Sequence, residues 1–384
     1  MKTSLLLFLF LLNTAFAHAQ WQSNNLDSVT ITSLSTSDSR IFAGAFTGVY
    51  ISGNFGDSWT FSHISPYYPV YSLVANGATL LAGTSNGLKI SSNNGGNWVS
   101  VNALINFSVN SVLVHGANIF TASIFGVHIS GNNGGQWNIV SNGLPAIGTA
   151  QKLAASGADI FVVIDSTIYT SNNNGGLWTK ADSGLNNNKV YSLAVNGSYM
   201  YAGTENGVYI SANNGGLWTA ANNGLPNTIV RSIAVSGTHI FAATNSGVYH
   251  SADNGGLWTS INAGLPGTNI NDVVICGTKI FVALADTVPT GQLWSRPLMQ
   301  VTGINEEETL YSQFSPFPNP ASGLLYISGA AASIKHAAFY NTAGEKFLAA
   351  RHGDSFDISG FPTGVYHLKF DDGKRLYTKK IIVK

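Results

Sequence analysis

Short apolar runs separated by Asn and Gly fill the chain from about residue 20 to residue 300. Residues 190–195 form one such run, and residues 199–203 and 207–211 follow it as a second and a third run before Trp218. Alternation with a period of two, the β-branched and aromatic residues and the Gly and Asn breaks predict β-strands. No helical periodicity interrupts this region.

The same strand pattern recurs with an eight-residue signature, S-x-[N/D]-x-G-x-x-W, which occurs six times. Successive tryptophans of the signature lie 39, 39, 41, 40 and 40 residues apart. A period of about 40 residues with Gly-rich turns is typical of a four-stranded propeller blade, which buries its faces only against neighbouring blades. The tryptophans are Trp59, Trp98, Trp137, Trp178, Trp218 and Trp258.

Each signature has the chemistry of a tight turn between a third and a fourth strand. Asn and Gly tolerate the positive φ angles that such turns require. We expect the Ser211 hydroxyl and the Asn213 amide to bond to the turn backbone. We expect Trp218, like its five counterparts, to be buried between adjacent sheets, where the burial of about 150–250 Å² would contribute roughly 4–6 kcal/mol.

This turn resembles the Asp-box of bacterial sialidases, sortilin-type receptors, xyloglucan-cleaving propellers and photosystem assembly factors. The resemblance extends over about residues 20–300 and implies a β-propeller, whereas it implies little about activity. The usual Asp is Asn in five of the six boxes and is present only as Asp253. Because a neutral amide can still bond to the turn, we expect a structural role. Calcium would need several carboxylates, which these loops lack.

The strands that follow the sixth box predict a seventh blade. Residues 271–275, 279–284 and 293–296 are expected to be its first three strands. We expect residues 21–26 to supply the fourth strand, because Trp21 and the Asn residues after it match the sequence that follows Trp218. The alternative is a seventh blade formed by residues 269–300, with Trp21 in a loose tail. The predicted fold is all-β, a seven-bladed propeller closed by the N-terminal strand, which leaves no free sheet edge.

The start of the chain has the three parts of a signal peptide. Lys2 is followed by the apolar run 5–12 and by Ala17-His18-Ala19, which fits a cleavage site after residue 19. A membrane anchor is the alternative, but the apolar run is far shorter than the about 20 residues that span a bilayer. We therefore expect a signal peptide at 1–19, the propeller at 20–302 and a linker at 303–316.

Residues 317–384 contain no box and carry more charge than the repeats, since nine of the 18 Lys and Arg residues lie after residue 302. We expect a small Ig-like β-sandwich of about seven short strands. Five of these strands are predicted at residues 324–327, 338–340, 356–358, 365–370 and 379–383.

Four motifs in this last segment carry a resemblance to a known export signal. They are Phe317-Pro318-Asn319-Pro320, the run from Tyr340 to Lys346, the run from Phe361 to Tyr366, and the basic and apolar end Lys379-Lys380-Ile381-Ile382-Val383-Lys384. Together they resemble the type A C-terminal sorting domain of the type IX secretion system of Bacteroidetes-like bacteria. The resemblance implies partners in the secretion and sorting machinery and a secreted or cell-surface location, often with removal of the tail. An ordinary adhesion module is the alternative.

The composition narrows the range of partners. Acidic and basic residues balance at 18 each, so no strong field would draw the chain to nucleic acid or to an anionic membrane. Cys276 is the single cysteine and lies in an apolar run, where a buried thiol is expected. The histidines are scattered without metal-ligand spacing. We expect no metal, no cofactor and no transmembrane segment.

Glycosidase activity is the enzymatic alternative, because Asp-box propellers include glycosidases. The propeller region holds only Arg40, Arg231 and Arg296, too few to spare for a sialidase-type arginine clamp. Other glycosidases need two carboxyl groups. Such a pair could come from Asp165, Glu205 and Asp286, which lie between second and third strands on the face opposite the boxes. Turn capping is the simpler interpretation of these residues.

Binding is the function that the sequence favours. Aromatic residues occupy loops on the same face: Phe46, Phe107, Phe125, and Tyr67 and Tyr68 between two prolines. Exposed rings on a weakly charged surface suit neutral glycans or a protein partner, although Phe107 and Phe125 could instead turn inward. The expected function is a non-catalytic binding or scaffold module, with a glycan-active hydrolase as the alternative. The candidate site residues are Phe46, Tyr67, Tyr68, Phe125, Asp165 and Glu205.

Overall fold

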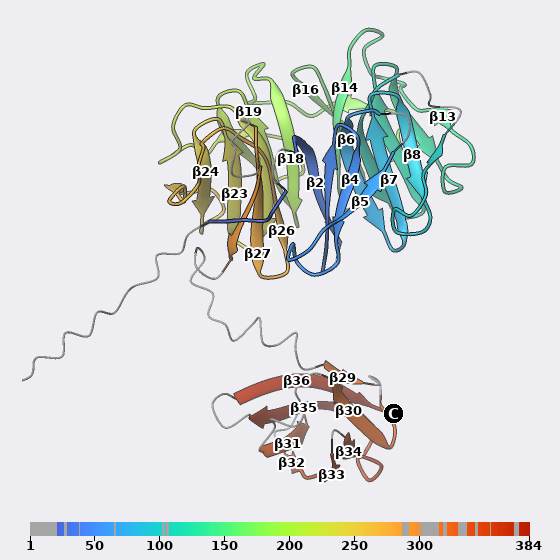
Figure 1. The fold of residues 1–384 in the computed structure, drawn as a ribbon, viewed down its shortest axis with the longest axis vertical. Coiled ribbons are helices and arrows are strands. Elements are labelled where there is room, and N and C mark those ends of the chain that lie inside the picture. Colours follow the sequence, from blue (N-terminus) through green and yellow to red (C-terminus); the bar gives the residue numbers. More distant parts are fainter. Residues whose placement is uncertain are drawn as a thin grey trace, which may run out of the picture. The chain divides into compact units, whose positions relative to one another are not determined.

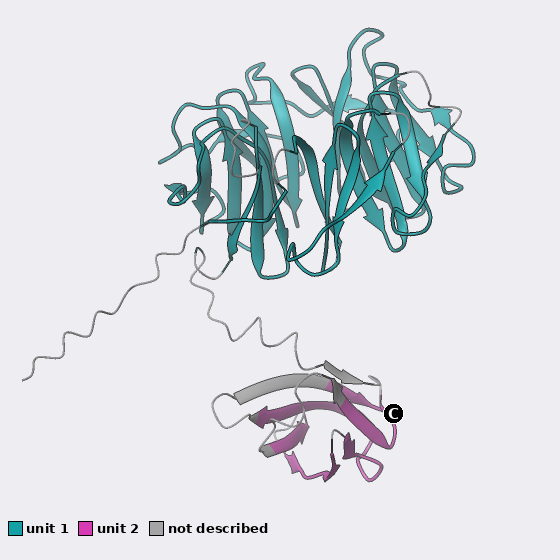
Figure 2. Cartoon of the chain, viewed as in Figure 1, with its two compact units in different colours: residues 1–302 teal, residues 303–384 magenta. Residues whose placement is uncertain are grey.

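A computed structural model of the chain divides into two compact units, residues 1–302 and residues 303–384 (Figure 2). The predicted signal peptide at 1–19 and residues 303–314 of the predicted linker lie outside the described residues. The structure describes residues 21–26, 29–37, 39–64, 67–101, 104, 107–285, 292–298, 301, 315–317, 321–328, 336–341, 345–353, 355–371 and 376–384.

Unit 1 is built from antiparallel sheets of four strands, and seven of them occur among its described residues (Figure 1). Sheet 1 is β2 (Ile31–Ser37), β3 (Arg40–Ala45), β4 (Gly48–Ser52) and β5 (Thr60–His63). Sheet 2 is β6 (Val70–Asn76), β7 (Thr79–Thr84), β8 (Gly87–Ser91) and β9 (Val99–Ser100). Sheet 3 is β10 (Val109–His115), β11 (Asn118–Ser123), β12 (Gly126–Ser130) and β13 (Asn138–Ile139). Sheet 4 is β14 (Ala150–Ser156), β15 (Asp159–Ile164), β16 (Thr167–Ser171) and β17 (Thr179–Lys180).

Three further sheets complete the set. Sheet 5 is β18 (Val190–Asn196), β19 (Tyr199–Thr204), β20 (Gly207–Ser211) and β21 (Thr219–Ala220). Sheet 6 is β22 (Val230–Ser236), β23 (His239–Thr244), β24 (Gly247–Ser251) and β25 (Thr259–Ser260). Sheet 7 is β26 (Ile270–Cys276), β27 (Lys279–Leu284), β28 (Leu293–Pro297) and β1 (Gln22–Ser23). The strands predicted for residues 190–211 therefore form where the alternation of apolar residues places them.

The first strands of the sheets pack against one another in a closed cycle. Strand β2 contacts β6, the contacts continue in order through β10, β14, β18, β22 and β26, and β26 returns to β2. The N-terminal segment completes sheet 7, because β1 pairs with β28, with Gln22 opposite Ser295 and Ser23 opposite Trp294. The prediction that the N-terminal segment supplies the fourth strand of the last sheet is therefore confirmed.

The six boxes form the turns that the sequence predicts. In the fifth box the Ser211 hydroxyl donates to Asn213 Oδ1 over 2.8 Å and accepts the N–H of Gly215 over 2.9 Å. Asn213 Oδ1 also accepts the N–H of Leu217 over 2.9 Å. Asn214, with φ of 52°, and Gly215, with φ of 82°, adopt the left-handed conformation that the turn needs. The box is a self-contained hydrogen-bonded turn.

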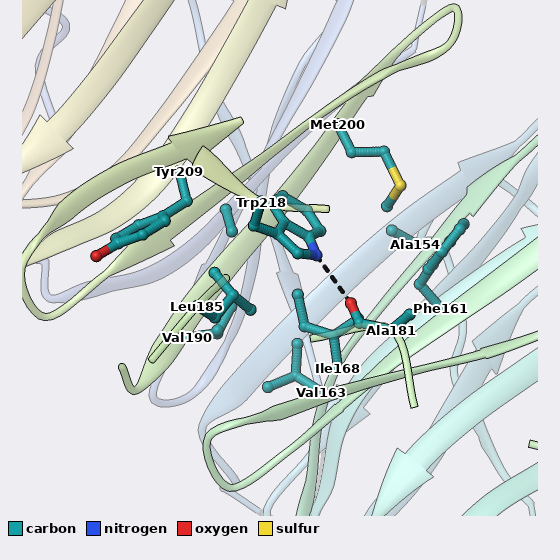
Figure 3. Packing of buried hydrophobic residues seen from close by; sticks show 11 residues of the cluster. Ala154, Phe161, Val163, Ile168, Ala181, Leu185, Val190, Met200, Tyr209 and Trp218 are labelled. Carbon is teal, nitrogen blue, oxygen red and sulfur yellow. Dashed lines mark hydrogen bonds between the residues drawn. The ribbon is translucent and has the colours of Figure 1, made fainter. Parts of the chain in front are cut away.

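Neighbouring sheets are joined through the tryptophan that ends the box. Trp218 is buried among residues of sheets 4 and 5, including Phe161, Ile168 and Val190, and its Nε1 donates to the Ala181 carbonyl of sheet 4 over 2.8 Å (Figure 3). Trp178 and Trp258 donate in the same way to carbonyls of the preceding sheet. Trp21 does so too, to the Ile261 carbonyl over 2.7 Å, so β1 takes the same position in its sheet.

The expectation of burial is wrong for Trp59, Trp98 and Trp137, which are only half-buried. The reason lies in the preceding sheet. Before Trp178, Trp218 and Trp258, the preceding sheet ends in a turn with a glycine in the left-handed conformation, and a Cβ on Gly184 would clash with the carbonyl oxygen of Trp218. The chain that follows residues 60–63 and 99–100, and residues 24–26 before sheet 1, lacks this glycine.

Unit 2 consists of two four-stranded sheets among its described residues. One has the order β29 (Ser315–Phe317), β30 (Leu324–Ser328), β34 (Ser355–Asp357) and β33 (Ala350–His352). The other has the order β32 (Lys346–Phe347), β31 (His336–Asn341), β35 (Gly364–Asp371) and β36 (Leu376–Val383). Leu325 and Phe356 of the first sheet share a core with Phe339, Leu368 and Phe370 of the second. The five strands predicted in this segment are confirmed.

Candidate functional site

One end of unit 1 collects the loops that the sequence singles out. Val190 at the start of β18 pairs with Thr204 at the end of β19, so first strands begin where second strands end. The turns from second to third strands and the connections to the next sheet therefore share one face, opposite the boxes. We call it the loop face.

The candidate carboxylates lie on the loop face in neighbouring sheets. Asp165 is exposed in the turn between β15 and β16, where its φ of 54° is left-handed. Glu205 is exposed in the turn between β19 and β20, and its Oε1 accepts the N–H of Lys189 over 3.2 Å. The two carboxylates therefore lie in separate turns of neighbouring sheets. Asp286, the third candidate, lies outside the described residues.

The candidate aromatic residues lie over three neighbouring sheets of the same face. Phe46 in the turn between β3 and β4 is 52% exposed, Tyr67 before β6 is 68% exposed, and Phe125 in the turn between β11 and β12 is 58% exposed. The exposure expected for the two tyrosines between prolines is confirmed for Tyr67 and is wrong for Tyr68, which is half-buried. We call Phe46, Tyr67, Tyr68, Phe107 and Phe125 the aromatic arc.

Two members of the aromatic arc pack against side chains that the sequence did not single out, Lys89 and His128. Tyr68 is half-buried, and its ring lies 5.5 Å from the Nζ of Lys89. Phe107 is half-buried as well, 5.1 Å from the Phe125 ring and 5.9 Å from the His128 ring, measured between centroids. Burial lowers the pKa of Lys89 and that of His128. The arc thus combines anchored rings with exposed ones.

A cavity of about 340 Å³ lies on the axis of unit 1 and is lined by first strands of six sheets. Its lining is rich in polar groups, and it contains the cationic side chains Lys152 and Arg231 together with the Asp272 carboxylate. The other lining residues are Thr32, Ser33, Leu34, Tyr71, Ser72, Leu73, Leu153, Tyr191, Ser192, Leu193, Ser232, Ile233 and Asn271. The sequence prediction missed this cavity.

A bulge in every first strand shapes the cavity. The register shifts at the same point of each strand, for example between Val190 and Ser192 in β18. The residue after the shift is serine in five sheets, but it is Lys152 in sheet 4 and Asp272 in sheet 7. These two exceptions to the repeat pattern are present in the sequence, and they are the signal that could have revealed the site.

The residue at this position also joins one sheet to the next. Ser72 Oγ accepts the N–H of Val112 over 3.1 Å, and Asp272 Oδ2 accepts the N–H of Leu34 over 2.7 Å. Burial raises the pKa of Asp272, while the Ser232 hydroxyl, the Leu34 N–H and the Lys152 charge oppose that rise. The Asp272 carboxylate therefore has hydrogen-bond partners from the protein.

The structure brings together two histidines that the sequence presented as scattered. His239 Nδ1 and His250 Nε2 lie 2.9 Å apart in sheet 6, and their rings are stacked. Burial, then the charges of His239 and Arg296, lower the pKa of His250 to about 4. Among the described residues, no group of three or more His, Cys, Asp or Glu side chains could hold a metal ion.

We expect acid to destabilise unit 1 through His250. The folded pKa lies below the unfolded value of about 6.5, so this stability is complete above pH 6.5 and is lost as the pH falls towards 4. With about 1.4 kcal/mol for each pKa unit and partial screening by solvent, the loss should be about 1–3 kcal/mol. Urea unfolding at pH 7 and pH 4.5 should show a smaller loss in His250→Gln than in the wild type. His115→Gln is the control, and an equal pH dependence of all three chains would contradict the expectation.

Two protein-family models match the chain. The DUF6242 beta propeller domain matches residues 135–280, and the secretion system C-terminal sorting domain matches residues 315–384. No curated protein matches the chain. The sorting-domain resemblance of the last segment is thereby confirmed, and the protein is secreted or carried at the cell surface. Within the part of the chain that the structure describes, no helix has the length and apolar character needed to cross a membrane.

Solved structures similar to this chain are propellers. YCF48 bound to D1 peptide has a TM-score of 0.60 and 13% identity, over 72% of this chain and 96% of that one. PorZ, an essential bacterial surface component of the type-IX secretion system of Porphyromonas gingivalis, has a TM-score of 0.57 and 13% identity, over 92% of this chain and 59% of that one. The GH74 enzyme of Niastella koreensis has a TM-score of 0.55 and 15% identity, over 71% of this chain and 43% of that one. Unit 1 is therefore a β-propeller.

Proposed function

We propose that unit 1 is a seven-bladed propeller that serves as a non-catalytic binding module, exported by a type IX-like route through the C-terminal sorting domain. The seven sheets and the closed cycle of their first strands support the blade number. The two facing sheets of unit 2 support an Ig-like sandwich. We further propose the boundaries 1–19 for the signal peptide, 20–302 for the propeller, 303–316 for the linker and 317–384 for the sorting domain.

The exposed rings of the aromatic arc carry the binding proposal. Soluble proteins place most large rings in the core, so several exposed rings over neighbouring sheets need a reason, and ligand contact supplies one. The rings lie on a face with few charges and with rings anchored beneath, which suits stacking on the apolar faces of neutral sugar rings. Tyr67 is the foremost contact residue, because it is the most exposed of them and its ring also packs edge-on against His63 at 5.2 Å.

A glycan-active hydrolase is the second candidate, and the likeness to a GH74 enzyme is the observation that favours it. In that case Asp165 and Glu205 would be the catalytic carboxylates. Both lie on the loop face in neighbouring sheets, yet each is exposed and placed in its own turn. Neither lines the axial cavity. This arrangement supports binding over hydrolysis.

A glycan array combined with a hydrolysis screen separates the two functions. We expect a glycan to be retained by the array without turnover. Tyr67→Ala should weaken its binding about 10-fold or more, because an exposed ring in a binding surface often contributes over 1 kcal/mol. Tyr199→Ala is the matched control, since Tyr199 is 40% exposed at the opposite end of its sheet.

The opposite result is equally clear. Turnover of a glycan that disappears in Glu205→Gln or Asp165→Asn would establish the hydrolase and contradict the binding proposal. Equal affinities of the Tyr67→Ala and Tyr199→Ala chains would show that the aromatic arc is not part of the binding surface. A protein ligand in place of a glycan would leave the array empty while a surface-material pulldown depended on Tyr67.

A further inference from the structure

We propose that the axial cavity of unit 1 binds a small hydroxy-carboxylate, a ligand with one carboxylate and several hydroxyl groups, and that Lys152 and Arg231 are its anion-binding residues. The site differs from the aromatic arc, and the proposal does not depend on a glycan or protein ligand there. A cavity of about 340 Å³ lies at the lower end of the range of about 300–1,000 Å³ that is usual for small-molecule sites.

The cavity concentrates positive charge in a chain that otherwise carries little charge. Only 9% of all residues are charged, yet Lys152 and Arg231 lie in this one cavity. Among the described residues, the one ion pair within 4.0 Å joins Lys279 to Asp57, so neither Lys152 nor Arg231 pairs with a carboxylate at that distance. The buried Nε of Arg231 has no hydrogen-bond partner in the described part of the protein. Unpaired buried donors of this kind are costly unless a ligand satisfies them.

Asp272 cancels only part of this positive charge. Its Oδ2 accepts the N–H of Leu34 over 2.7 Å, which links sheet 7 to sheet 1, and its Oδ1 accepts the N–H of Val273 over 2.9 Å. One carboxylate faces two cations, which leaves an excess of positive charge in a confined site. Guanidinium and ammonium groups together recognise carboxylates well.

The remaining lining selects for hydroxyl groups. The hydroxyls of Ser33, Ser72 and Ser192 and the amide of Asn271 contribute small polar groups, and the buried Oγ of Ser192 has no partner within the described residues. Tyr71 and Tyr191 stand at the bulge of their strands, one residue before these serines. Ser33 Oγ donates to the Val70 carbonyl and the Asn271 amide to the Ile31 carbonyl, each over 3.2 Å, so the group among these that lacks a partner is the Ser192 hydroxyl. A simple fatty acid would offer this hydroxyl no partner, whereas a polyhydroxylated acid would.

Three six-carbon probes test the two requirements separately by calorimetric titration of the intact secreted chain. Gluconate carries the carboxylate and the hydroxyls, sorbitol carries only the hydroxyls, and hexanoate carries only the carboxylate. We expect gluconate to bind at least 10-fold more tightly than either of the others, and more weakly at high salt. Equal binding of gluconate and sorbitol, tighter binding of hexanoate, or no binding of gluconate at millimolar concentration would overturn the proposal.

Variants assign the binding to the cavity. Lys152→Gln and Arg231→Gln should each weaken gluconate binding at least 10-fold, whereas Arg231→Lys should retain part of it. Lys180→Gln, on the exposed outer strand β17 of the same sheet as Lys152, should leave it unchanged. Melting curves of all four chains verify that they fold. Gluconate binding that survives in both Lys152→Gln and Arg231→Gln would place the anion elsewhere and contradict the assignment.

Discussion

Removal of residues 21–26 should destabilise unit 1 more than any single substitution. This segment carries β1, the buried side chains of Trp21 and Leu26, and the Asn24 amide that donates to the Gly56 carbonyl of sheet 1 over 3.3 Å. The loss of one buried tryptophan costs about 3–5 kcal/mol, and the truncated chain would also expose the edge of β28. We expect the melting temperature of unit 1 to fall by at least about 10 °C, given about 2–4 °C for each kcal/mol in a domain of this size.

Differential scanning calorimetry of chains that begin at residue 20 or at residue 27 measures this effect. Gln22→Ala with Ser23→Ala is the control, because it changes two side chains of β1 and keeps the backbone pairing with β28. A synthetic peptide of residues 20–30 should restore part of the lost stability in trans. Melting of the truncated chain within about 2 °C of the longer one would show that β1 does not close the ring.

Trp178→Ala should cost about 3–5 kcal/mol of unfolding free energy. The Trp178 indole is buried between sheets 3 and 4, and its Nε1 donates to the Val140 carbonyl over 2.6 Å. Substitution leaves a large void and an unpaired carbonyl at a joint of the ring. Burial of the indole on both faces makes collapse of the void difficult, which places the expected cost at the upper end of the range.

Trp137→Ala provides the matched comparison, because Trp137 has the same position in the box of the preceding sheet. It is half-buried, and its Nε1 donates to Gly134 of its own box over 3.0 Å. We expect a cost of about 1–2 kcal/mol, since the half-buried indole removes less area from water and donates no hydrogen bond to another sheet. Urea unfolding followed by fluorescence of the remaining tryptophans measures both values. Equal costs for the two variants would contradict the distinction between fully buried and half-buried indoles.

The features that could be predicted depend on interactions between residues close in the sequence. The strand pattern around Tyr199 and the box turn around Ser211 arise from alternation and from hydrogen bonds that span four residues. The pairing of β1 with β28 joins distant residues, yet it was predictable, because the repeat period left one blade without its fourth strand. The exposure of Tyr67 could be predicted as well, since the prolines at 66 and 69 keep it out of a strand.

The predictions of burial were only partly correct for side chains whose neighbours come from another sheet. The tryptophans of the boxes look alike in sequence, but only those that follow a glycine-containing turn in the preceding sheet are fully buried. Tyr68 and Phe107 are half-buried because Lys89 and His128 lie beneath them. No local rule predicts these pairings, because the partners lie about 20 residues away and meet only after the sheets have packed.

The amino-acid sequence by itself determined the repeat, its strands, its turns and the route by which the ring closes, because alternation and turn chemistry are short-range and the repeat period shows which blade lacks its fourth strand. Only the tertiary structure decided that Lys152, Arg231 and Asp272 share one cavity. These residues belong to three different sheets, and the closed cycle of first strands brings them to a common axis. Their meeting follows from the geometry of the whole ring, which no segment of the chain encodes alone.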